Sequence, residues 1–426
     1  MMKTKAVRLY GEKDLRLEEF ELPELKDDEI LARVVSDSIC MSTYKETMLG
    51  PNHKRVPDDI ARNPIIIGHE FCGEILEVGS KWSKDFKAGD KFAIQPNIKW
   101  PRTMNGLGAP GYSYPYIGGD AVNIIIPNEV MEQDCLLEYK NPTFFYGSIA
   151  EPMSCIVAAF KASFHIEDNY IHHMGIKEGG NLAILAGAGA MGLGAIDYAL
   201  HNQDKRPGRI VVTDVDRERL NRAESIYSRD DAEKIGIELI YVNTAEHPDS
   251  DAYLLSLTGD KGYDDVFLYA PVRQVVEQGS RILGFDGCLN FFAGPTDNQF
   301  SGTINFYNIH YLSQHVVGTS GGNTRDMLDA MELMNSGKIN PVAMITHIGG
   351  LDAAADATIN LPNIPGGKKL IYTNIRMELT AIEDFEKKSE GNPLFNKLAE
   401  IIKNNRGLWS EEAEKYLLEN AESINS

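Results

Sequence analysis

The chain has 426 residues, of which 43% are hydrophobic and 24% charged, and its formal net charge is −20. This length suits two domains better than one, because a single core rarely grows past about 250–300 residues. The acidic balance argues against nucleic acid as a partner, since a phosphate backbone needs a basic surface. An anionic substrate would therefore need a local basic pocket.

The hydrophobic pattern and the cysteine content favour a soluble protein. Met1–Asp14 has no apolar signal core, and no apolar run is long enough to span a bilayer. The five cysteines are scattered, as is typical of reduced thiols in a cytosolic protein. They are Cys40, Cys72, Cys135, Cys155 and Cys288. We therefore expect a cytoplasmic protein with no membrane partner.

The first 150 residues are predicted to be rich in β-structure. Gly, Pro and Asp separate short strand-like segments, namely Lys5–Tyr10, Ile30–Ser36, Ile65–Val78, Lys91–Gln95 and Ala121–Pro127. The segment Gln95–Gly119 is rich in Gly, Pro, Asn and Tyr, which predicts a long loop. Such loops are more often functional, or contact surfaces, than filler.

From Gly180 onwards, predicted strands alternate with predicted helices. The strand candidates are Asn181–Ala186, Arg209–Thr213, Glu238–Asn243, Val266–Ala270, Cys288–Ala293 and His315–Gly318. This alternation predicts a parallel sheet of βαβ units. A helix is expected at Thr324–Ser336, followed by mixed structure as far as Ile375.

The last fifty residues, Met377–Ser426, have a helical pattern of their own. Ser410 is a plausible helix start, because Glu411 and Glu412 follow it. Trp409 indicates that the segment packs onto another part of the protein. Two apolar faces at helical spacing consist of Phe395, Leu398 and Ile402, and of Ala413, Tyr416 and Leu417.

Residues 187–192 match the GxGxxG pattern of dinucleotide-binding loops. Alone the match is weak, since a chance Gly/Ala stretch or a tight turn would also produce it. Here an apolar strand precedes it and a helical pattern follows. The first Gly would allow the turn, the second would admit the pyrophosphate, and the third would permit close helix–strand packing. The loop and helix start that we expect to bind the phosphates comprise Gly187, Gly189, Ala190, Met191 and Gly192.

Asp214 ends the second predicted strand, about 20 residues after the loop. An acid there accepts hydrogen bonds from ribose hydroxyls and repels a 2′-phosphate, which favours NAD(H) over NADP(H). Arg217 and Arg219 lie close by in the sequence and could weaken that preference, so NADP(H) stays an alternative. Asp214 could instead be a helix N-cap.

Four residues with metal-binding side chains stand out, namely Cys40, His69, Glu70 and Glu151. Each alone has an ordinary explanation. A lone Cys is most often a small buried hydrophobe, a lone His a surface or core residue, and Glu151-Pro152 a helix start. The order of these residues among the surrounding motifs is more informative.

Taken in order, the motifs resemble the medium-chain zinc-dependent dehydrogenases, the family of alcohol, sorbitol and threonine dehydrogenases. The resemblance covers about residues 1–376 and rests on Cys40–Ser42, Gly68–Gly73, Val78–Gly79, Phe86–Asp90, Glu151–Pro152, Gly187–Gly192 and Ser336–Pro341. It implies an α/β fold in which residues 1–153 and 319–376 form a GroES-like, β-rich catalytic domain. A Rossmann domain with a doubly wound parallel sheet, residues 154–318, would be inserted between them. Residues 377–426 would form a C-terminal helical extension, and the protein would be a homo-oligomer, either dimer or tetramer.

Carried over position by position, the resemblance implies that Cys40 and His69 bind a catalytic zinc ion. Glu151 stands where the polyol dehydrogenases have their Glu, and Glu70 would be either a ligand or a neighbour of the ligands. Zinc would polarise the substrate oxygen, and the Ser42 hydroxyl would pass a proton to or from that oxygen.

Two departures from the family pattern are visible. Many members carry four clustered cysteines for a structural zinc, but Gln95–Gly119 contains no cysteine, so we expect one catalytic zinc and no structural zinc. Many members also have a proton-relaying His where this chain has Lys45. Either Lys45 belongs to a different relay or it has another role.

Within the family, Ser36–Thr43, the cysteine-free loop and the acidic tail around Trp409 most resemble the sugar-phosphate members. They imply reduction of a ketose phosphate, L-sorbose 1-phosphate in particular, to sorbitol 6-phosphate. A phosphate needs cations, and four lie between Cys40 and His69 in the sequence: Lys45, Lys54, Arg55 and Arg62. These could equally be solvated loop charges.

Three other functions stay open at this point. The protein could oxidise an unphosphorylated polyol or a threonine-like substrate. It could be a zinc-free relative that reduces quinones or enoyl groups, although the metal-binding residues argue against this. It could also be a non-catalytic dinucleotide-binding protein that uses its C-terminal helices to bind a partner.

Overall fold

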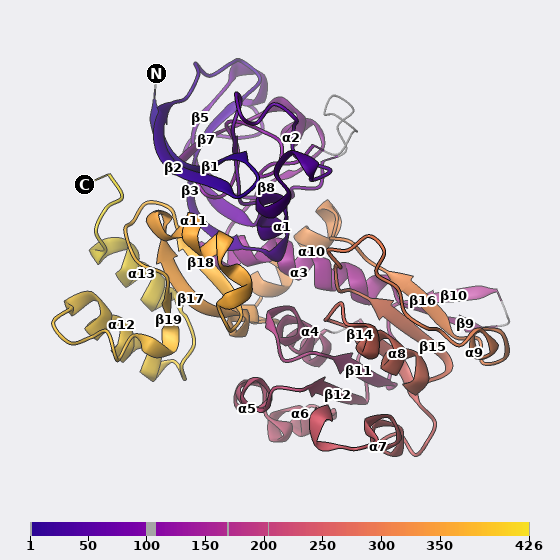
Figure 1. The fold of residues 1–426 in the computed structure, drawn as a ribbon. Coiled ribbons are helices and arrows are strands. Elements are labelled where there is room, and N and C mark those ends of the chain that lie inside the picture. Colours follow the sequence, from indigo (N-terminus) through magenta and orange to yellow (C-terminus); the bar gives the residue numbers. More distant parts are fainter. Residues whose placement is uncertain (1, 99–107, 168–169, 203, 426) are drawn as a thin grey trace. The chain divides into compact units, whose positions relative to one another are not determined.

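The computed structural model describes residues 2–98, 108–167, 170–202 and 204–425. The chain divides into two compact units. Figure 1 colours the ribbon by residue number, so the residues of each unit can be followed by colour. Unit 1 comprises Met1–Glu151 and Ile345–Ser426, and unit 2 comprises Pro152–Met344. Residues 319–344, which the resemblance assigned to the catalytic domain, group with unit 2.

Ion pairs link helix α10, within residues 319–344, to α3. Helix α10 (Thr324–Asn335) begins within a capping box of Asn323 and Asp326. The ammonium group of Lys161, near the end of helix α3 (Phe145–Ala162), lies 2.9 Å from Asp326 and 2.5 Å from Asp329. The start of α10 is thus tied to the part of α3 that belongs to unit 2.

Unit 2 is built on a six-stranded parallel sheet. The strands are β11 (Asn181–Leu185), β12 (Arg209–Asp214), β13 (Glu238–Asn243), β14 (Tyr263–Leu268), β15 (Leu283–Phe291) and β16 (His315–Gly318). Their order is β13-β12-β11-β14-β15-β16, which is the doubly wound Rossmann arrangement. The expected parallel sheet is confirmed, although β15 begins five residues earlier than predicted.

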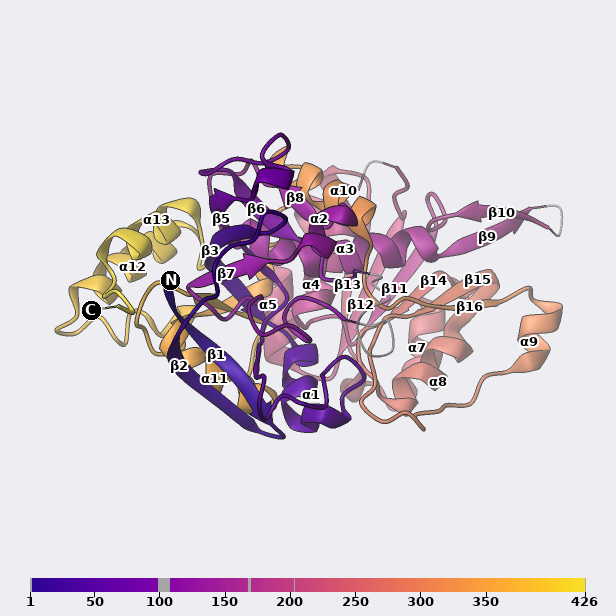
Figure 2. The same cartoon turned by 90° about the horizontal axis from the view of Figure 1, so that it is seen from above.

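Helices follow most strands of this sheet, as the alternation predicted. They are α4 (Ala190–His201), α5 (Arg217–Ile226), α6 (Arg229–Lys234), α7 (Ser250–Ser256), α8 (Arg273–Ile282) and α9 (Phe306–Tyr311). A hairpin of β9 (Phe164–Glu167) and β10 (Ile171–Met174) was not predicted. It extends from one end of the sheet in Figure 2. In β9, His165 is buried beside Asp265, with 3.2 Å between His165 Nε2 and Asp265 Oδ2.

Unit 1 contains a sheet of strands drawn from both ends of the chain. Its order is β19-β17-β18-β3-β5-β6-β8, and β7 also pairs with β3. The bounds are β3 (Ile30–Ile39), β5 (Phe71–Val78), β6 (Lys91–Ile94), β7 (Asn123–Ile126), β8 (Leu136–Glu138), β17 (Ile345–Gly350), β18 (Lys368–Tyr372) and β19 (Thr380–Ala381). The sequence predicted only mixed structure as far as Ile375. In the structure, the strands after residue 344 complete the sheet that the N-terminal segment begins.

A second, three-stranded sheet in unit 1 has the order β2-β1-β4, formed by β2 (Asp14–Glu21), β1 (Lys3–Gly11) and β4 (Ile65–Ile66). The predicted strand 65–78 is therefore two strands, with Gly68, His69 and Glu70 in the connection. The helices of unit 1 are α1 (Met41–Leu49), α2 (Asn128–Glu132), the first turns of α3, α11 (Leu351–Ile359), α12 (Pro393–Asn404) and α13 (Glu411–Asn420).

The C-terminal segment packs within unit 1. Ser410 is the N-cap of α13, as predicted, and its hydroxyl accepts the N–H of Ala413. Trp409 is 1% exposed, which confirms that the segment covers other residues. Near the chain end, Ser423 forms a β-bridge with Ile375. This bridge therefore links the end of the chain to the segment that follows β18.

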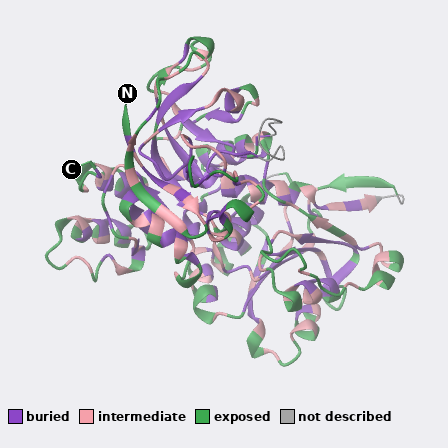
Figure 3. Cartoon of the chain, turned by 45° about the horizontal axis from the view of Figure 1, so that its top comes forward, coloured by how far each residue is buried: buried purple, intermediate pink, exposed green. Residues whose placement is uncertain are grey.

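The buried apolar side chains form clusters. Figure 3 shows the strands largely buried and the outward faces of the helices exposed. In unit 1, one cluster centres on Ala32, Val34 and Phe71, and a second on Val7, Ile39 and Leu351. None of the helices in the described residues combines the length and apolar character needed to cross a bilayer.

Candidate functional site

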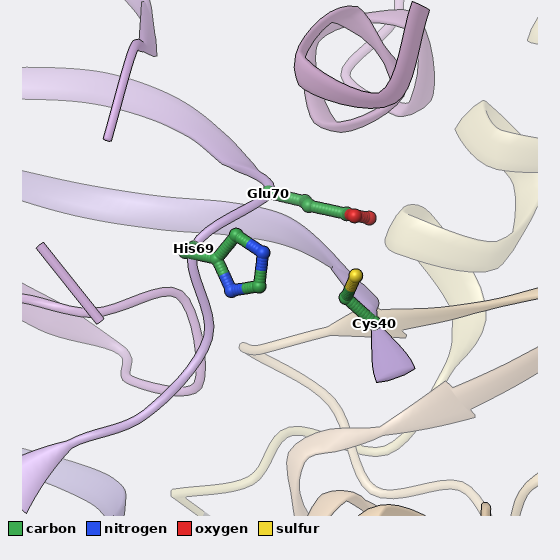
Figure 4. A group of neighbouring side chains, drawn as sticks. All are labelled: Cys40, His69 and Glu70. Atoms are coloured by element: carbon green, nitrogen blue, oxygen red, sulfur yellow. The ribbon is translucent and has the colours of Figure 1, made fainter. Parts of the chain in front are cut away.

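Two neighbouring strands bring Cys40, His69 and Glu70 together. Cys40 follows β3 directly and is the N-cap residue of α1, while His69 and Glu70 precede β5. Because β3 and β5 are antiparallel partners, the end of one lies beside the start of the other, and Ser38 donates its N–H to the Glu70 carbonyl at 3.0 Å. One ligand atom from each of Cys40, His69 and Glu70 lies within 4.8 Å of the others. Figure 4 shows these three side chains close together.

The imidazole of His69 has a hydroxyl at each ring nitrogen. Thr43 Oγ1 lies 3.2 Å from Nδ1, and the Tyr112 hydroxyl lies 3.1 Å from Nε2. His69 is 4% exposed, and burial together with nearby cations lowers its pKa well below the ordinary value, so the ring is neutral. A neutral ring with Thr43 at Nδ1 can present a lone pair at Nε2.

Glu70 is held by a cation that the sequence had not singled out. The ammonium group of Lys368, at the start of β18, donates to Glu70 Oε1 at 2.6 Å, and the Ser38 hydroxyl donates to Oε2. Lys368 is 6% exposed and Glu70 1% exposed. Burial alone would lower the pKa of Lys368, but Glu70 and Cys40 raise it above the ordinary value. Lys368 is therefore charged and compensates part of the acidity of the site.

The Cys40 thiol lies in a negative environment. Burial and the Glu70 carboxylate raise its pKa to about 12, and Glu151 contributes in the same direction. Glu151, in α3 just before Pro152, is thus within electrostatic reach of Cys40 but does not belong to the cluster defined by the 4.8 Å limit. A divalent cation would offset this negative charge and favour the thiolate.

Ser42 and Lys45, expected to move protons, both lie in α1. The Cys40 thiol is 3.7 Å from the Ser42 hydroxyl. Lys45 is half-buried, and burial lowers the pKa of its ammonium group, while the Cys40 side chain acts against this shift. Ser42 therefore contacts Cys40, and Lys45 is near enough for its charge to interact with the Cys40 side chain.

Tyr112 has one cation, Arg55, against its ring, and a histidine stacked on it. The guanidinium of Arg55 lies 5.0 Å from the centre of the Tyr112 ring, and the His53 ring stacks on the same tyrosine. Burial and the charges of Arg55, Lys54 and Lys45 lower the pKa of His53 to about 4, so these cations act on a common region. Arg62 is exposed. Of the predicted loop 95–119, residues 99–107 lie outside the described residues, and Tyr112 is a part of it that contacts the site.

The glycine loop of unit 2 connects β11 to α4. A Cβ at Gly187 would lie 2.6 Å from the Ile184 side chain, and one at Gly192 would lie 2.1 Å from the Gly187 carbonyl. These two glycines are required by the fold itself. Gly189 differs, since an added Cβ would meet none of the described atoms within 4 Å, and its φ of −82° suits any residue. The open space at Gly189 therefore fits the approach of a ligand.

Asp214 ends β12 and faces this loop. Its carboxylate accepts the N–H of Val215 at 2.8 Å and that of Ala188 at 3.3 Å. The N-cap of α5 is Asp216, so the interpretation of Asp214 as a helix cap is wrong. Arg217 pairs with Glu246, and Arg219 Nε lies 3.5 Å from Asp216. Both arginines are thus balanced by carboxylates of their own.

Comparisons with known proteins agree with this geometry. Two family models match, an alcohol dehydrogenase GroES-like domain at residues 26–128 and a zinc-binding dehydrogenase at residues 190–336. The mannitol-1-phosphate 5-dehydrogenase of Aliivibrio fischeri is 52% identical over 420 residues, covering 98% of each chain. The L-sorbose 1-phosphate reductase of Klebsiella pneumoniae is 49% identical over 425 residues, covering 100% of this chain and 99% of the relative. The chain belongs to the zinc-binding dehydrogenase family.

The solved structures support the same fold. The 2R,3R-butanediol dehydrogenase of Bacillus subtilis is 22% identical, with a TM-score of 0.70 over 87% of this chain and 100% of its own. As a zinc-binding dehydrogenase, the protein is an oxidoreductase of the alcohol and polyol dehydrogenase class. The expected combination of a GroES-like domain and a Rossmann domain is confirmed.

Sequence patterns did not reveal every residue of the site. Lys368 starts an apolar strand as one of two adjacent lysines, both buried, and this unusual pairing was the available signal. Thr43 and Tyr112 carried no signal, because only folding places their hydroxyls at the two nitrogens of His69.

Proposed function

We propose that the protein is a zinc-dependent, nicotinamide-linked oxidoreductase that interconverts a ketose phosphate and a polyol phosphate. The proximity of Cys40 and His69, with the carboxylates of Glu70 and Glu151 both acting on the Cys40 thiol, carries this proposal. Thiolate, imidazole and carboxylate are the donors that zinc takes, and catalytic sites use three protein ligands with one position left open. Ligand atoms within 4.8 Å of one another need only small movements to reach a common ion.

The third zinc ligand is either Glu151 or Glu70. We take Glu151 as the ligand, because it stands where the polyol dehydrogenases of the family have their Glu and because Glu70 forms a buried ion pair with Lys368. In this arrangement Glu70 and Lys368 form a neighbouring pair that orients the ligands without replacing one. Bound zinc would supply Lewis acidity at the substrate oxygen. We assign Ser42 to proton exchange with that oxygen, and Lys45, half-buried in the same helix, to the path towards solvent.

We assign the nicotinamide cofactor to the loop 187–192. The open space at Gly189 lets a pyrophosphate approach the backbone, and the free N–H groups at the start of α4, from Ala190 and Met191, offer it hydrogen bonds. Asp214 would accept hydrogen bonds from the ribose. Because Arg217 and Arg219 are paired with carboxylates, NAD(H) is the preferred cofactor and NADP(H) the alternative.

The names of the two relatives and the cations near His53 support a phosphorylated substrate. Both relatives, about 50% identical over nearly their whole length, are named for a sugar or polyol phosphate. Lys45 and Arg55 provide cations in a chain whose net charge is −20. The conversion of L-sorbose 1-phosphate to sorbitol 6-phosphate is our first candidate reaction. Oxidation of mannitol 1-phosphate is the second, favoured by the name of the Aliivibrio relative.

A cofactor-oxidation screen tests this function. NADH and NADPH would be compared over ketose phosphates and the corresponding free ketoses, with the zinc content of the purified protein measured in parallel. In a Lys54→Ala/Arg55→Ala variant, we expect KM for the sugar phosphate to rise about 10–100-fold, since a charged hydrogen bond contributes about 1.5–3 kcal/mol. KM for a free ketose should change far less. Arg62→Ala is the matched control, because this exposed arginine belongs to the same segment.

Three results would contradict the proposal in different ways. Equal effects on phosphorylated and free substrates would remove the phosphate site and favour a dehydrogenase of free polyols or threonine-like compounds. A protein without stoichiometric zinc would contradict the metal assignment. No cofactor oxidation with any carbonyl compound would favour a dinucleotide-binding protein without catalysis.

A further inference from the structure

Glu414 is a buried acid in the C-terminal segment that reaches a distant helix. It lies in α13 and is 3% exposed. Its Oε2 accepts the N–H of Phe144 at 2.7 Å, and its Oε1 accepts the N–H of Phe145 at 2.9 Å. These residues start α3, some 270 positions earlier in the sequence.

This contact supplies what the sequence at the start of α3 lacks. The first N–H groups of a helix have no partner within it and need an acceptor. Ser, Thr, Asp or Asn at the N-cap would provide one, but a phenylalanine side chain cannot accept a hydrogen bond. The Glu414 carboxyl group therefore caps α3 in place of the Phe144 side chain.

The same carboxylate is also connected to β18. The Tyr372 hydroxyl donates to Glu414 Oε1 at 2.8 Å, and the indole N–H of Trp409 donates to the Tyr372 oxygen at 2.9 Å. Tyr372 is the last residue of β18, and Lys368, the first, holds Glu70. Glu414 thus joins the start of α3 to the strand that supplies the cation of the metal-binding cluster.

Glu151 lies between this cap and a break in the hydrogen bonding of α3. It is six residues beyond Phe145, about 9 Å along the helix, and directly precedes Pro152. Proline has no N–H, so the Ser148 carbonyl loses the donor that a regular helix would give it. Residues 145–151 are therefore held less firmly by the rest of α3, and contacts at their N-terminal end gain importance for their orientation.

We propose that Glu414 is a positioning residue of the active site, setting the helix that carries Glu151 against the strand that carries Lys368. The proposal rests on the proposed function, in which Glu151 lies at the zinc ion. It makes residues 377–426 part of the support of the metal site, since Glu414 and Trp409 both come from this segment. Neither family model extends into it, because the second one ends at residue 336.

Metal binding tests the proposal without relying on turnover. The protein would be stripped of metal, and its zinc affinity measured by competition with a chelator. The ligand-field absorption of the Co²⁺-substituted protein would report the coordination geometry. We expect Glu414→Gln to lower zinc affinity by about 10–100-fold and to shift the Co²⁺ spectrum, as loss of a residue that orients metal ligands does. Glu419→Gln, an exposed acid of the same helix, is the matched control and should match the wild type.

A double-mutant cycle separates positioning from a general loss of structure. If Glu414 acts through Glu151, Glu414→Gln should lower zinc affinity much less in a Glu151→Gln background than in the wild type. Tyr372→Phe, which removes a single hydroxyl, provides a milder variant should Glu414→Gln fail to fold. It should shift the Co²⁺ spectrum in the same direction.

The outcomes distinguish the two levels of the argument. Suppose that Cys40→Ser abolishes zinc binding while Glu414→Gln and Tyr372→Phe bind zinc like the wild type. The positioning role is then wrong and the proposed function stands. Equal losses of affinity with and without Glu151 would also overturn the positioning role. If Cys40→Ser leaves zinc affinity unchanged, the proposed function fails, and this inference fails with it.

Discussion

Substitutions of two glycines in the same loop should affect different properties. Gly192→Ala should lower the stability of the protein, and Gly189→Ala should lower its affinity for NADH. In Gly192→Ala, the new Cβ would lie 2.1 Å from the Gly187 carbonyl, whereas ordinary contact begins at 3.4 Å. The helix start would have to move by roughly 1 Å within a packed core, and overpacking of this kind costs about 1–3 kcal/mol or more. In Gly189→Ala the new Cβ meets none of the described atoms within 4 Å.

The stability of Gly189→Ala follows from two small terms that oppose each other. Gly189 is the N-cap of α4, and alanine is worse than glycine there by about 0.5 kcal/mol. Alanine also restricts the unfolded chain, which stabilises the folded state by about 0.4–1 kcal/mol. The free energy of unfolding should therefore stay within about 0.5 kcal/mol of the wild type. A methyl group in the space meant for the pyrophosphate should nevertheless weaken NADH binding at least tenfold, or about 1.4 kcal/mol.

Urea denaturation and the fluorescence of bound NADH measure both quantities on the same samples. Gly192→Ala should lose stability, and Gly189→Ala should keep its stability and lose NADH affinity. If Gly189→Ala binds NADH as tightly as the wild type, the loop does not receive the pyrophosphate at this position. If it unfolds as easily as Gly192→Ala, the interpretation of the space around Gly189 is wrong.

Two further predictions concern the acidic side chains of Asp214 and Glu414. Asp214→Asn removes the repulsion of a 2′-phosphate and should raise the ratio of kcat/KM for NADPH to kcat/KM for NADH about tenfold. Initial rates with both cofactors would measure this ratio. An unchanged ratio would refute the assignment of Asp214 to the ribose. Burial raises the pKa of Glu414 from its ordinary value of 4.5 to about 7 in the folded protein, although the N–H groups of Phe144 and Phe145 act against this shift. The folded state then holds this proton more tightly than the unfolded state, so this group should cost the wild type about 3 kcal/mol of stability as pH rises from about 4.5 to 7. Unfolding free energies at pH 5 and pH 8, compared with Glu414→Gln, should show this loss only in the wild type, and parallel curves would contradict it.

The parts of the fold that depend on local pattern were predictable from the sequence. In unit 2, each βαβ unit signals itself within about 30 residues by an apolar run, a turn and a helical period. This is why β13 and β16 match their predicted bounds. The motif order also singled out Cys40, His69 and Glu70, which the structure brings together. The strands β17 and β18 were missed although they form a βαβ unit with α11, and only the pairing of β18 with β3 depends on residues distant in the sequence.

Hydrogen bonds between residues that are distant in the sequence could not be predicted, for a physical reason. Hydrogen bonds between Lys368 and Glu70, or between Glu414 and Phe144, leave no periodic trace in either segment. A buried ion pair requires both members, and the sequence around each one shows only a charge next to apolar residues. The roles of Lys368, Tyr112 and Glu414 therefore emerge only once the strands are paired.

The ion pair between Glu70 and Lys368 also has a consequence for biosynthesis. The two residues are separated by 298 positions, so at about 5–20 residues per second Lys368 leaves the ribosome roughly 15–60 s after Glu70. During that time the nascent N-terminal strands have no β18 to pair with, and Glu70 has no ammonium group beside it. Unit 2, encoded between them, has all its strands earlier and can fold while the N-terminal segment waits. A chain that is stopped before residue 368 should therefore carry a complete Rossmann domain and an N-terminal sheet that needs help from chaperones.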